Sequence, residues 1–311
     1  MEQALNSRIG RRTPGGISVE NLVLKYSPEL EPVLQGVSFH IKPTEKVGLV
    51  GRTGSGKSTL ALSFFRFVDP EEGRIIIDGI DITTIGLEDL RSRLTIIPQD
   101  AVLFAGSIRE NLDPFNEHSD EDCLDSLRRV QLRTSSSPQS TVASSRETSR
   151  PGTPPNGEAT TEDGDSSTAG TVIDRSNKMV ITLDTQVSEG GNNFSSGQRQ
   201  LIAMARALLR RSRFVVMDES TASVDFATDI KIQEAIREEF KDSILITIAH
   251  RLRTVIDYDR ILVMDAGKVA EFDTPKNLIA REDGVFRSMC LKSGDFEKLK
   301  EAANRKAVWS P

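Results

Sequence analysis

A glycine-rich loop constrains the fold of this chain more than any other feature of its sequence. Residues 51–59 read GRTGSGKST and follow directly on a short apolar run at residues 46–50 that is typical of a β-strand. The loop fits the pattern G-x-x-x-x-G-K-[ST], and a helix is predicted after it over residues 59–68. Because strand, loop and helix follow one another as a phosphate-binding element requires, a glycine-rich turn that fits by chance is a poor alternative.

This phosphate loop, residues 51–59, carries the groups that a nucleoside triphosphate needs. Its glycines let successive backbone N–H groups point at a phosphate, and the following helix adds its positive dipole end. Lys57 is expected to reach the β- and γ-phosphates, and Ser58 to give its hydroxyl to Mg²⁺. The residues predicted to bind nucleotide are Gly51, Thr53, Gly54, Ser55, Gly56, Lys57, Ser58 and Thr59. We therefore expect ATP to bind here and to be hydrolysed.

A second apolar run ends in two carboxylates. Residues 214–217, FVVM, are apolar throughout, as a buried strand of a parallel sheet should be, and ligand sites lie at the carboxyl ends of such strands. Asp218 is predicted to hold Mg²⁺, and Glu219 to accept a proton from the attacking water. The alternative, a helix-capping acid followed by a solvated one, is weakened by the phosphate loop upstream.

The rest of the chain alternates strand and helix patterns. Further strands are predicted at residues 17–26, 33–41, 75–77, 244–248 and 261–264, and further helices at residues 195–210, 230–241 and 281–292. This alternation indicates an α/β domain with a largely parallel sheet.

Residues 134–178 differ in composition from their surroundings. Of these 45 positions 18 are Ser or Thr, and none is Leu, Met, Phe, Tyr or Trp. Such a segment cannot bury enough apolar surface to offset the entropy of ordering it, so we predict a disordered insertion within one domain. A tolerated loop is the simpler interpretation; phosphorylation, for example at Ser137 or Thr153, is a hypothesis.

Charge and cysteine content exclude several classes of protein. The formal net charge is −6 with no dense basic run, so no nucleic-acid partner is expected. Two distant cysteines, Cys123 and Cys290, exclude a disulfide framework and make a reducing compartment the default. No signal peptide is evident, and no apolar run reaches the roughly 20 residues of a spanning helix, so the chain is not expected to cross a membrane by itself.

A third motif, NFSSGQRQ at residues 193–200, resembles the signature of the nucleotide-binding domains of ABC transporters. Phe194 departs from the commoner leucine at its position in the motif. A Ser/Gly-rich helix start offers N–H groups and a hydroxyl to an anion, although a simple Ser N-cap is the alternative. In this family the anion is the γ-phosphate held by the opposite domain. The residues that the resemblance implies for this contact are Ser195, Ser196, Gly197 and Gln198.

Other family elements occur in the expected order. Tyr26 resembles the aromatic residue that stacks on adenine, although a lone Tyr in a strand is more often part of a core or rim. Gln99 resembles the Q-loop glutamine that senses Mg²⁺ and water, and residues 223–225 resemble the D-loop. His250, about 30 residues after the two carboxylates, resembles the switch histidine that contacts the γ-phosphate, whereas a core histidine would be the usual alternative. The resemblance implies a catalytic set of Lys57, Gln99, Glu219 and His250, and a Mg²⁺ set of Ser58, Gln99 and Asp218.

The resemblance also implies a fold and a domain organisation. The expected fold is α/β, with a P-loop NTPase core of RecA-like type, an antiparallel β subdomain and a helical subdomain. Residues 1–16 would be a linker, residues 17–293 the ABC ATPase domain with its insertion, and residues 294–311 a C-terminal tail.

Two longer segments narrow the resemblance. Residues 98–121 and 187–201 resemble exporters of the C subfamily, the multidrug-resistance-associated type, and above all their second nucleotide-binding domain. This implies a motor domain at the cytoplasmic face of a membrane, with ATP held between it and a partner nucleotide-binding domain and with the transmembrane domains elsewhere. The alternatives are a soluble ABC ATPase acting on nucleic acid or ribosomes, and a non-hydrolysing, ATP-gated interaction module. Intact Glu219 and His250 argue against the latter.

Overall fold

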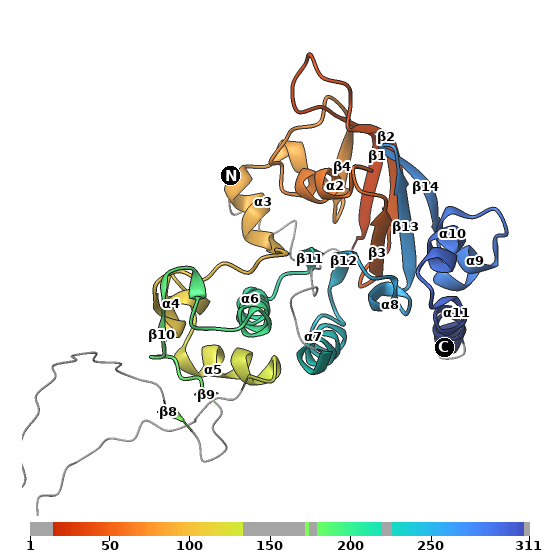
Figure 1. Cartoon of the computed structure of the whole chain (residues 1–311). Helices are drawn as coiled ribbons and strands as arrows, with labels where there is room; N and C mark the ends of the chain where they lie inside the picture. The colour runs from red at the N-terminus through yellow and green to blue at the C-terminus, as the bar shows by residue number, and fades with distance from the viewer. Residues whose placement is uncertain (1–14, 133–171, 174–178, 219–225, 308–311) are drawn as a thin grey trace, which may run out of the picture.

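A six-stranded sheet forms the centre of the domain in the computed structural model, which describes residues 15–132, 172–173, 179–218 and 226–307 (Figure 1). The strand order is β14-β13-β3-β12-β11-β6, and every neighbouring pair is parallel except β13 and β14. The strands are β3 (Lys46–Gly51), β6 (Leu94–Ile97), β11 (Phe214–Asp218), β12 (Ile244–Ile248), β13 (Arg260–Asp265) and β14 (Lys268–Asp273). All of β12 is buried, as expected for a strand covered on both faces. The predicted, largely parallel sheet is confirmed.

An antiparallel sheet forms a second layer, with the strand order β2-β1-β4-β5. Its strands are β1 (Ile17–Leu24), β2 (Leu34–Ile41), β4 (Glu72–Ile77) and β5 (Ile80–Asp81). Buried and exposed residues largely alternate along β2, because only one face of this sheet meets the core. The antiparallel subdomain implied by the resemblance is therefore present.

Helix α2 (Lys57–Phe64) connects the cores of the two sheets. Leu60 and Phe64 belong to one apolar cluster with residues of both sheets, and the Phe64 ring meets that of Phe214 edge to face at 5.2 Å between centroids. The helix ends earlier than predicted, because Arg66 adopts a left-handed conformation with φ 50°.

Helices cover the other face of the central sheet and share a second apolar cluster with it. The α4, α5 and α6 helices group at one end of the molecule as the helical subdomain, with α7 beside α6 (Figure 1). Apart from α2, the helices of the described ranges are α3 (Leu87–Arg93), whose Leu90 lies in the first apolar cluster, and α4 (Ile108–Leu112), α5 (Asp120–Arg129), α6 (Ser196–Arg210), α7 (Phe226–Glu239), α8 (Leu252–Val255), α9 (Pro275–Ala280), α10 (Val285–Lys292) and α11 (Phe296–Ala307). Short elements are β7 (Gly106–Ser107), β10 (Gln186–Val187) and the 3₁₀ turns η1 (Ile82–Thr84) and η2 (Glu189–Gly191). None of the helices in the described ranges is both long and apolar enough to span a bilayer.

The C-terminal segment differs from the sequence-based prediction. Residues 294–311 were expected to form a tail, whereas α11 packs against α9 and α10. Leu299 and Ala303 of α11 are buried in the second apolar cluster, and the Phe296 ring lies 5.4 Å from the Arg287 guanidinium. The prediction missed this helix because only a few small or apolar residues on its surface carry the packing.

The predicted insertion at residues 134–178 lies outside the described residues, apart from β8 (Val172–Ile173). This two-residue strand pairs antiparallel with β9 (Met179–Val180). On either side of the insertion, Leu132 and Ile181 are buried in the second apolar cluster, which the central sheet shares with the helices on this face, here called the helical layer. The insertion therefore begins and ends at the helical layer.

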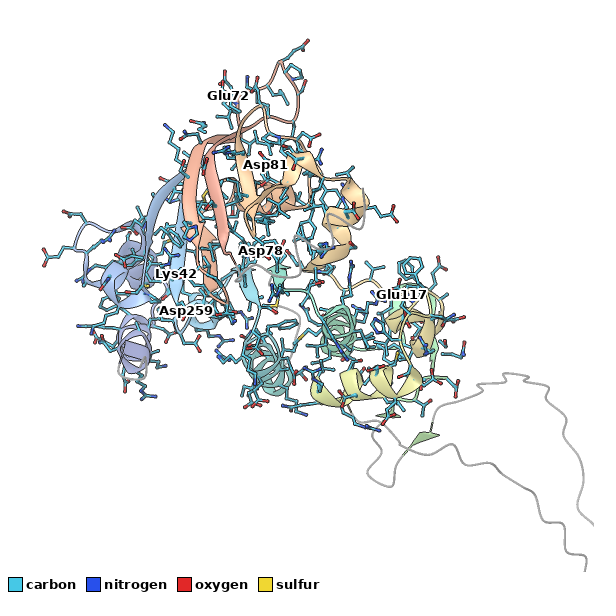
Figure 2. All side chains as sticks on the ribbon, turned by 180° about the vertical axis from the view of Figure 1, so that it is seen from behind. Lys42, Glu72, Asp78, Asp81, Glu117 and Asp259 are labelled. Carbon is cyan, nitrogen blue, oxygen red and sulfur yellow. The ribbon has the colours of Figure 1, made fainter. Side chains whose placement is uncertain are left out.

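The amino-terminal end of β3 is held by a dense set of polar contacts. The Asp259 carboxylate accepts a hydrogen bond from the Lys46 backbone N–H at 2.7 Å, and Arg260 forms an ion pair with Glu45. Figure 2 shows Asp259 near Lys42, which precedes β3, whereas the phosphate loop follows the other end of this strand. Because β3 is fixed here and paired on both sides, the loop at its other end starts from a rigid position.

Both cysteines should resist modification in the folded protein. Cys123 and Cys290 are fully buried, and burial raises the pKa of the Cys290 thiol to about 12. The thiolate is the reactive form, and this pKa lowers the fraction of Cys290 present as thiolate roughly a thousandfold near neutral pH. We expect an aromatic disulfide reagent to label neither thiol until denaturant is added. Rapid stoichiometric labelling of the native protein would contradict the described helix packing.

Candidate nucleotide-binding site

Four parallel strands end at one edge of the central sheet, and each leads into a segment that the sequence singled out. Leu49 of β3 pairs with Ile248 of β12, which pairs with Asp218 of β11, and Met217 pairs with Ile97 of β6. The strands therefore end almost level with one another. The phosphate loop, the predicted switch histidine, the predicted Mg²⁺ carboxylate and the predicted Q-loop glutamine all follow at this edge, where ligand sites of parallel sheets lie.

The phosphate loop has the backbone conformation that its glycines permit. Gly54 and Gly56 have φ of 78° and 95°, a region that side chains disfavour, and a Cβ on Gly56 would lie 2.9 Å from the Leu34 side chain. Within the loop the Ser55 hydroxyl is buried and has no hydrogen-bond partner among the described residues. A buried polar atom of this kind is what a loop that binds an anion would offer to its ligand.

Lys57 begins α2 and folds back over the loop. Its ammonium donates hydrogen bonds to the carbonyl oxygens of Gly51 and Arg52, both at 2.9 Å. Burial lowers the pKa of this ammonium, and the nearby Asp218 carboxylate opposes that shift. The structure thus brings together the lysine of the loop and the carboxylate at the end of β11, two groups 161 positions apart by their residue numbers, as the sequence predicted.

Asp218 and His250 face each other across the ends of neighbouring strands. The His250 Nε2 atom lies 3.8 Å from Oδ1 of Asp218, beyond hydrogen-bond distance, and this Oδ1 is buried without a hydrogen-bond partner in the described part of the chain. Burial raises the pKa of the Asp218 carboxyl, while His250 and Lys57 act in the opposite direction. A buried carboxylate oxygen with free acceptor capacity fits Mg²⁺, which prefers oxygen ligands. Ser58, the other residue predicted to bind this ion, is exposed in the first turn of α2 next to Lys57.

Two further predicted residues of this edge, Gln99 and Thr53, are exposed. Gln99 is exposed and lies two residues beyond the end of β6. Glu219 and residues 223–225 lie outside the described residues, so their roles stay predictions from the sequence. Thr53 is exposed on the loop, as its predicted contact with nucleotide requires.

Tyr26 lies beside the phosphate loop although it is 33 residues away in sequence from Thr59. Its hydroxyl is 3.0 Å from the Thr59 hydroxyl, and 53% of the residue's surface is exposed. The residue is therefore not part of the core, and its ring is accessible next to the loop. The contact of Tyr26 with a bound base stays a prediction from the sequence.

The signature residues do not join this edge of the sheet. Ser195 caps α6 through a capping box, in which its hydroxyl accepts from the Gln198 backbone N–H at 3.2 Å and its own N–H donates to the Gln198 side chain at 2.8 Å. Ser196 and Gly197 open the helix. Since α6 packs against α4, α5, α7 and β6, Figure 1 places this segment in the helical layer, apart from α2. Phe194, the departure from the family pattern, is buried.

Two groups of polar residues near the site were not predicted. Arg206 of α6 donates to the backbone carbonyl oxygens of Val102 and Asn111, and Asn111 bonds to both backbone polar groups of Phe104. These contacts tie the segment after Gln99 to the signature helix. In the second group, an aspartate of α7 forms ion pairs with the two arginines that follow His250. Nothing in the residue pattern marks either group, because their members are far apart in sequence.

Comparison with known proteins agrees with this geometry. The model of the ABC transporter family matches residues 34–222. The chain is 50% identical over 280 residues to the ABC-type transporter cicA of Emericella nidulans, covering 90% of this chain and 18% of cicA. It is 46% identical over 294 residues to the ATP-dependent bile acid permease of Saccharomyces cerevisiae, with 94% and 17% covered. With ATP-binding cassette sub-family C member 3 of Mus musculus it shares 45% identity over 285 residues, with 92% and 16% covered.

A solved structure shows the same fold. A bacterial Atm1-family ABC exporter with ATP bound superimposes with a TM-score of 0.70 at 29% identity, over 91% of this chain and 42% of the exporter chain. The chain spans less than a fifth of the length of cicA, of the bile acid permease and of the mouse sub-family C protein. The family match and the arrangement of the phosphate loop, Asp218 and His250 agree, and the chain belongs to the ABC transporter family as one of its nucleotide-binding ATPase domains.

Proposed function

We propose that this domain binds ATP with Mg²⁺ and hydrolyses it to power an exporter. The observation that carries the proposal is the meeting of Lys57, Asp218 and His250 at one edge of the sheet, where Asp218 retains a buried oxygen without a hydrogen-bond partner. The relatives named above as transporters, and the exporter with ATP bound, support the coupling to transport.

Each residue of the site would have a separate task. The loop amides and Lys57 would hold the β- and γ-phosphates, and Tyr26 would stack on the base. Asp218, Ser58 and Gln99 would hold Mg²⁺, which when bound neutralises charge on the phosphates. Glu219 would take a proton from the attacking water, and His250 would contact the γ-phosphate.

The site would be completed by a second nucleotide-binding domain. Because the signature residues Ser195–Gln198 lie in the helical layer of this chain, their contact with ATP would be made across a dimer, to nucleotide held by the partner. The domain would work at the cytoplasmic face of a membrane, together with transmembrane domains. Its sequence resembles the second nucleotide-binding domain of C-subfamily exporters, which keeps a glutamate at the position of Glu219. This likeness favours a hydrolytic site that contains the phosphate loop of this chain.

The Asp218→Asn variant tests the proposal through two readouts. We expect Mg²⁺-dependent phosphate release from ATP to be lost, as it should be in the wild-type protein when EDTA removes the metal. The nucleotide-free variant should melt at the same temperature as the wild type or above it. Burial raises the pKa of Asp218, so its carboxylate costs free energy in the folded state near neutral pH, and the amide removes that cost.

Asp242→Asn is the matched control, since Asp242 is exposed in the turn before β12. It should leave both phosphate release and melting unchanged. ATP binding without Mg²⁺-dependent hydrolysis in the wild-type protein would favour a non-hydrolysing module, and salt-dependent binding of DNA or RNA would favour a soluble ABC ATPase.

A further inference from the structure

His250 needs an anchor that its own side chain does not provide. The side chain is 57% exposed and meets Asp218 only at 3.8 Å, so packing contributes little to its position. On the amino-terminal side the backbone is fixed, because the Ala249 N–H donates to the Leu49 carbonyl oxygen of β3 at 3.1 Å. The position of the imidazole then depends on what holds the backbone on the carboxyl-terminal side.

That side is held by Asp229 in the first turns of α7. The Oδ2 atom of Asp229 accepts a hydrogen bond from Nη2 of Arg253 at 3.2 Å and lies 3.6 Å from Nη1 of Arg251. Arg251 directly follows His250 and is the N-cap residue of α8, and Arg253 lies within α8. Asp229 is only 7% exposed, so its carboxylate is withdrawn from water and these two arginines compensate its charge.

Asp229 joins α7 to the start of α8, the segment that directly follows His250. A second ion pair, Arg237 with Asp257 at 2.7 Å, also joins α7 to the segment after β12, but at its far end. Asp229 instead acts on the residue next to His250. It also lies on the helix that follows β11, the strand that ends in Asp218. One carboxylate therefore links the segments that follow two neighbouring strand ends of the site.

We propose that Asp229 is a positioning residue, which holds Arg251 and thereby sets the backbone of His250 so that its imidazole faces Asp218. That the imidazole then contacts the γ-phosphate of ATP rests on the proposed function; the positioning itself does not. The alternative role, a purely structural ion pair, would change the stability of the protein without moving the imidazole.

Histidine NMR signals test the positioning without any nucleotide. The chain has three histidines, His40, His118 and His250, so imidazole signals of selectively labelled protein are few, and a His250→Ala variant assigns the one of interest. In Asp229→Asn the His250 signals should shift or broaden while those of His40 and His118 stay unchanged. Asp257→Asn, which breaks the second ion pair, should leave the His250 signals in place. Unchanged His250 signals in folded Asp229→Asn would overturn the proposal.

Arg251→Gln provides a second variant if Asp229→Asn does not fold. This variant removes the other partner of the ion pair. The Arg251 side chain is 37% exposed, so its replacement disturbs the core less than that of Asp229, and it should perturb the His250 signals in the same way. His250 signals identical to those of the wild type would overturn the proposal here too.

Kinetics connects the positioning to hydrolysis. In Asp229→Asn we expect kcat to fall about tenfold with KM for ATP within about twofold, because a misplaced group at the reacting end of a bound substrate costs rate and not affinity. In a His250→Ala background the same substitution should have no further effect. An equal loss with and without His250 would overturn the proposal. Perturbed NMR signals in a protein without any ATPase activity would support the positioning and reject the proposed function.

Discussion

Glu219→Gln should stop most ATP hydrolysis and leave ATP binding intact. The amide has nearly the size of the carboxylate but cannot accept a proton from the attacking water. Since general-base action contributes about 10²–10⁴-fold, we expect kcat to fall by about that factor. Phosphate release measured at high protein concentration, where the proposed dimer would form, gives the rate, and a fluorescent ATP analogue gives the affinity.

Glu238→Gln is the control for this result. Glu238 is an exposed residue of α7, and its loss should change neither the rate nor the affinity. A Glu219→Gln protein that hydrolyses ATP as fast as the wild type would show that another group accepts the proton. A loss of binding as large as the loss of rate would assign Glu219 to nucleotide binding.

Lys57→Met should weaken ATP binding itself. The ammonium is partly buried, bonded to two loop carbonyl oxygens and close to Asp218, so the variant removes a positive charge from a site built for an anion. Charge-assisted hydrogen bonds contribute about 1.5–3 kcal/mol, so we expect the affinity to fall about 10- to 100-fold. Because burial lowers the pKa of Lys57, the affinity of the wild type should also decline at a less alkaline pH than an ordinary lysine would give.

Lys25→Met is the matched control for the charge. Lys25 forms an ion pair with Glu71 at 3.1 Å next to Tyr26, and surface pairs of this kind contribute about 0–1 kcal/mol to stability. Its removal should leave ATP affinity unchanged. If Lys25→Met weakened binding as much as Lys57→Met, general electrostatic attraction and not the phosphate loop would explain the affinity.

The strands that carry the site were predictable because they are buried on both faces. Residues 244–248 were predicted as a strand and form β12 with the same bounds, and residues 214–217 differ from β11 by one residue. In contrast β6 and β14 were not predicted. The β6 strand begins directly after α3, so no turn residues mark its start, and β14 lies half-exposed at the sheet edge, where apolar and polar residues mix.

The residues of the site likewise divide into those that the sequence predicts and those that it does not. The residues of the phosphate loop and the two carboxylates could be predicted because each motif is contiguous in sequence. The contacts of Asp229 with Arg251 and of Arg206 with Asn111 could not be predicted. Arg206 and Asn111 are 95 positions apart, and both contacts depend on how the helices pack on the sheet. A single sequence contains no signal for such pairings.

The burial of Leu132 and Ile181 in one cluster has a consequence for protein engineering. Both ends of the intervening segment are fixed by the helical layer, at some remove from the sheet edge with the phosphate loop, as Figure 1 shows for α5 and β9 relative to α2. Doubling the length of a flexible connection between fixed ends costs only about 0.6 kcal/mol of closure entropy. A fluorescent reporter or an affinity handle can therefore be inserted between these two residues without altering the phosphate loop.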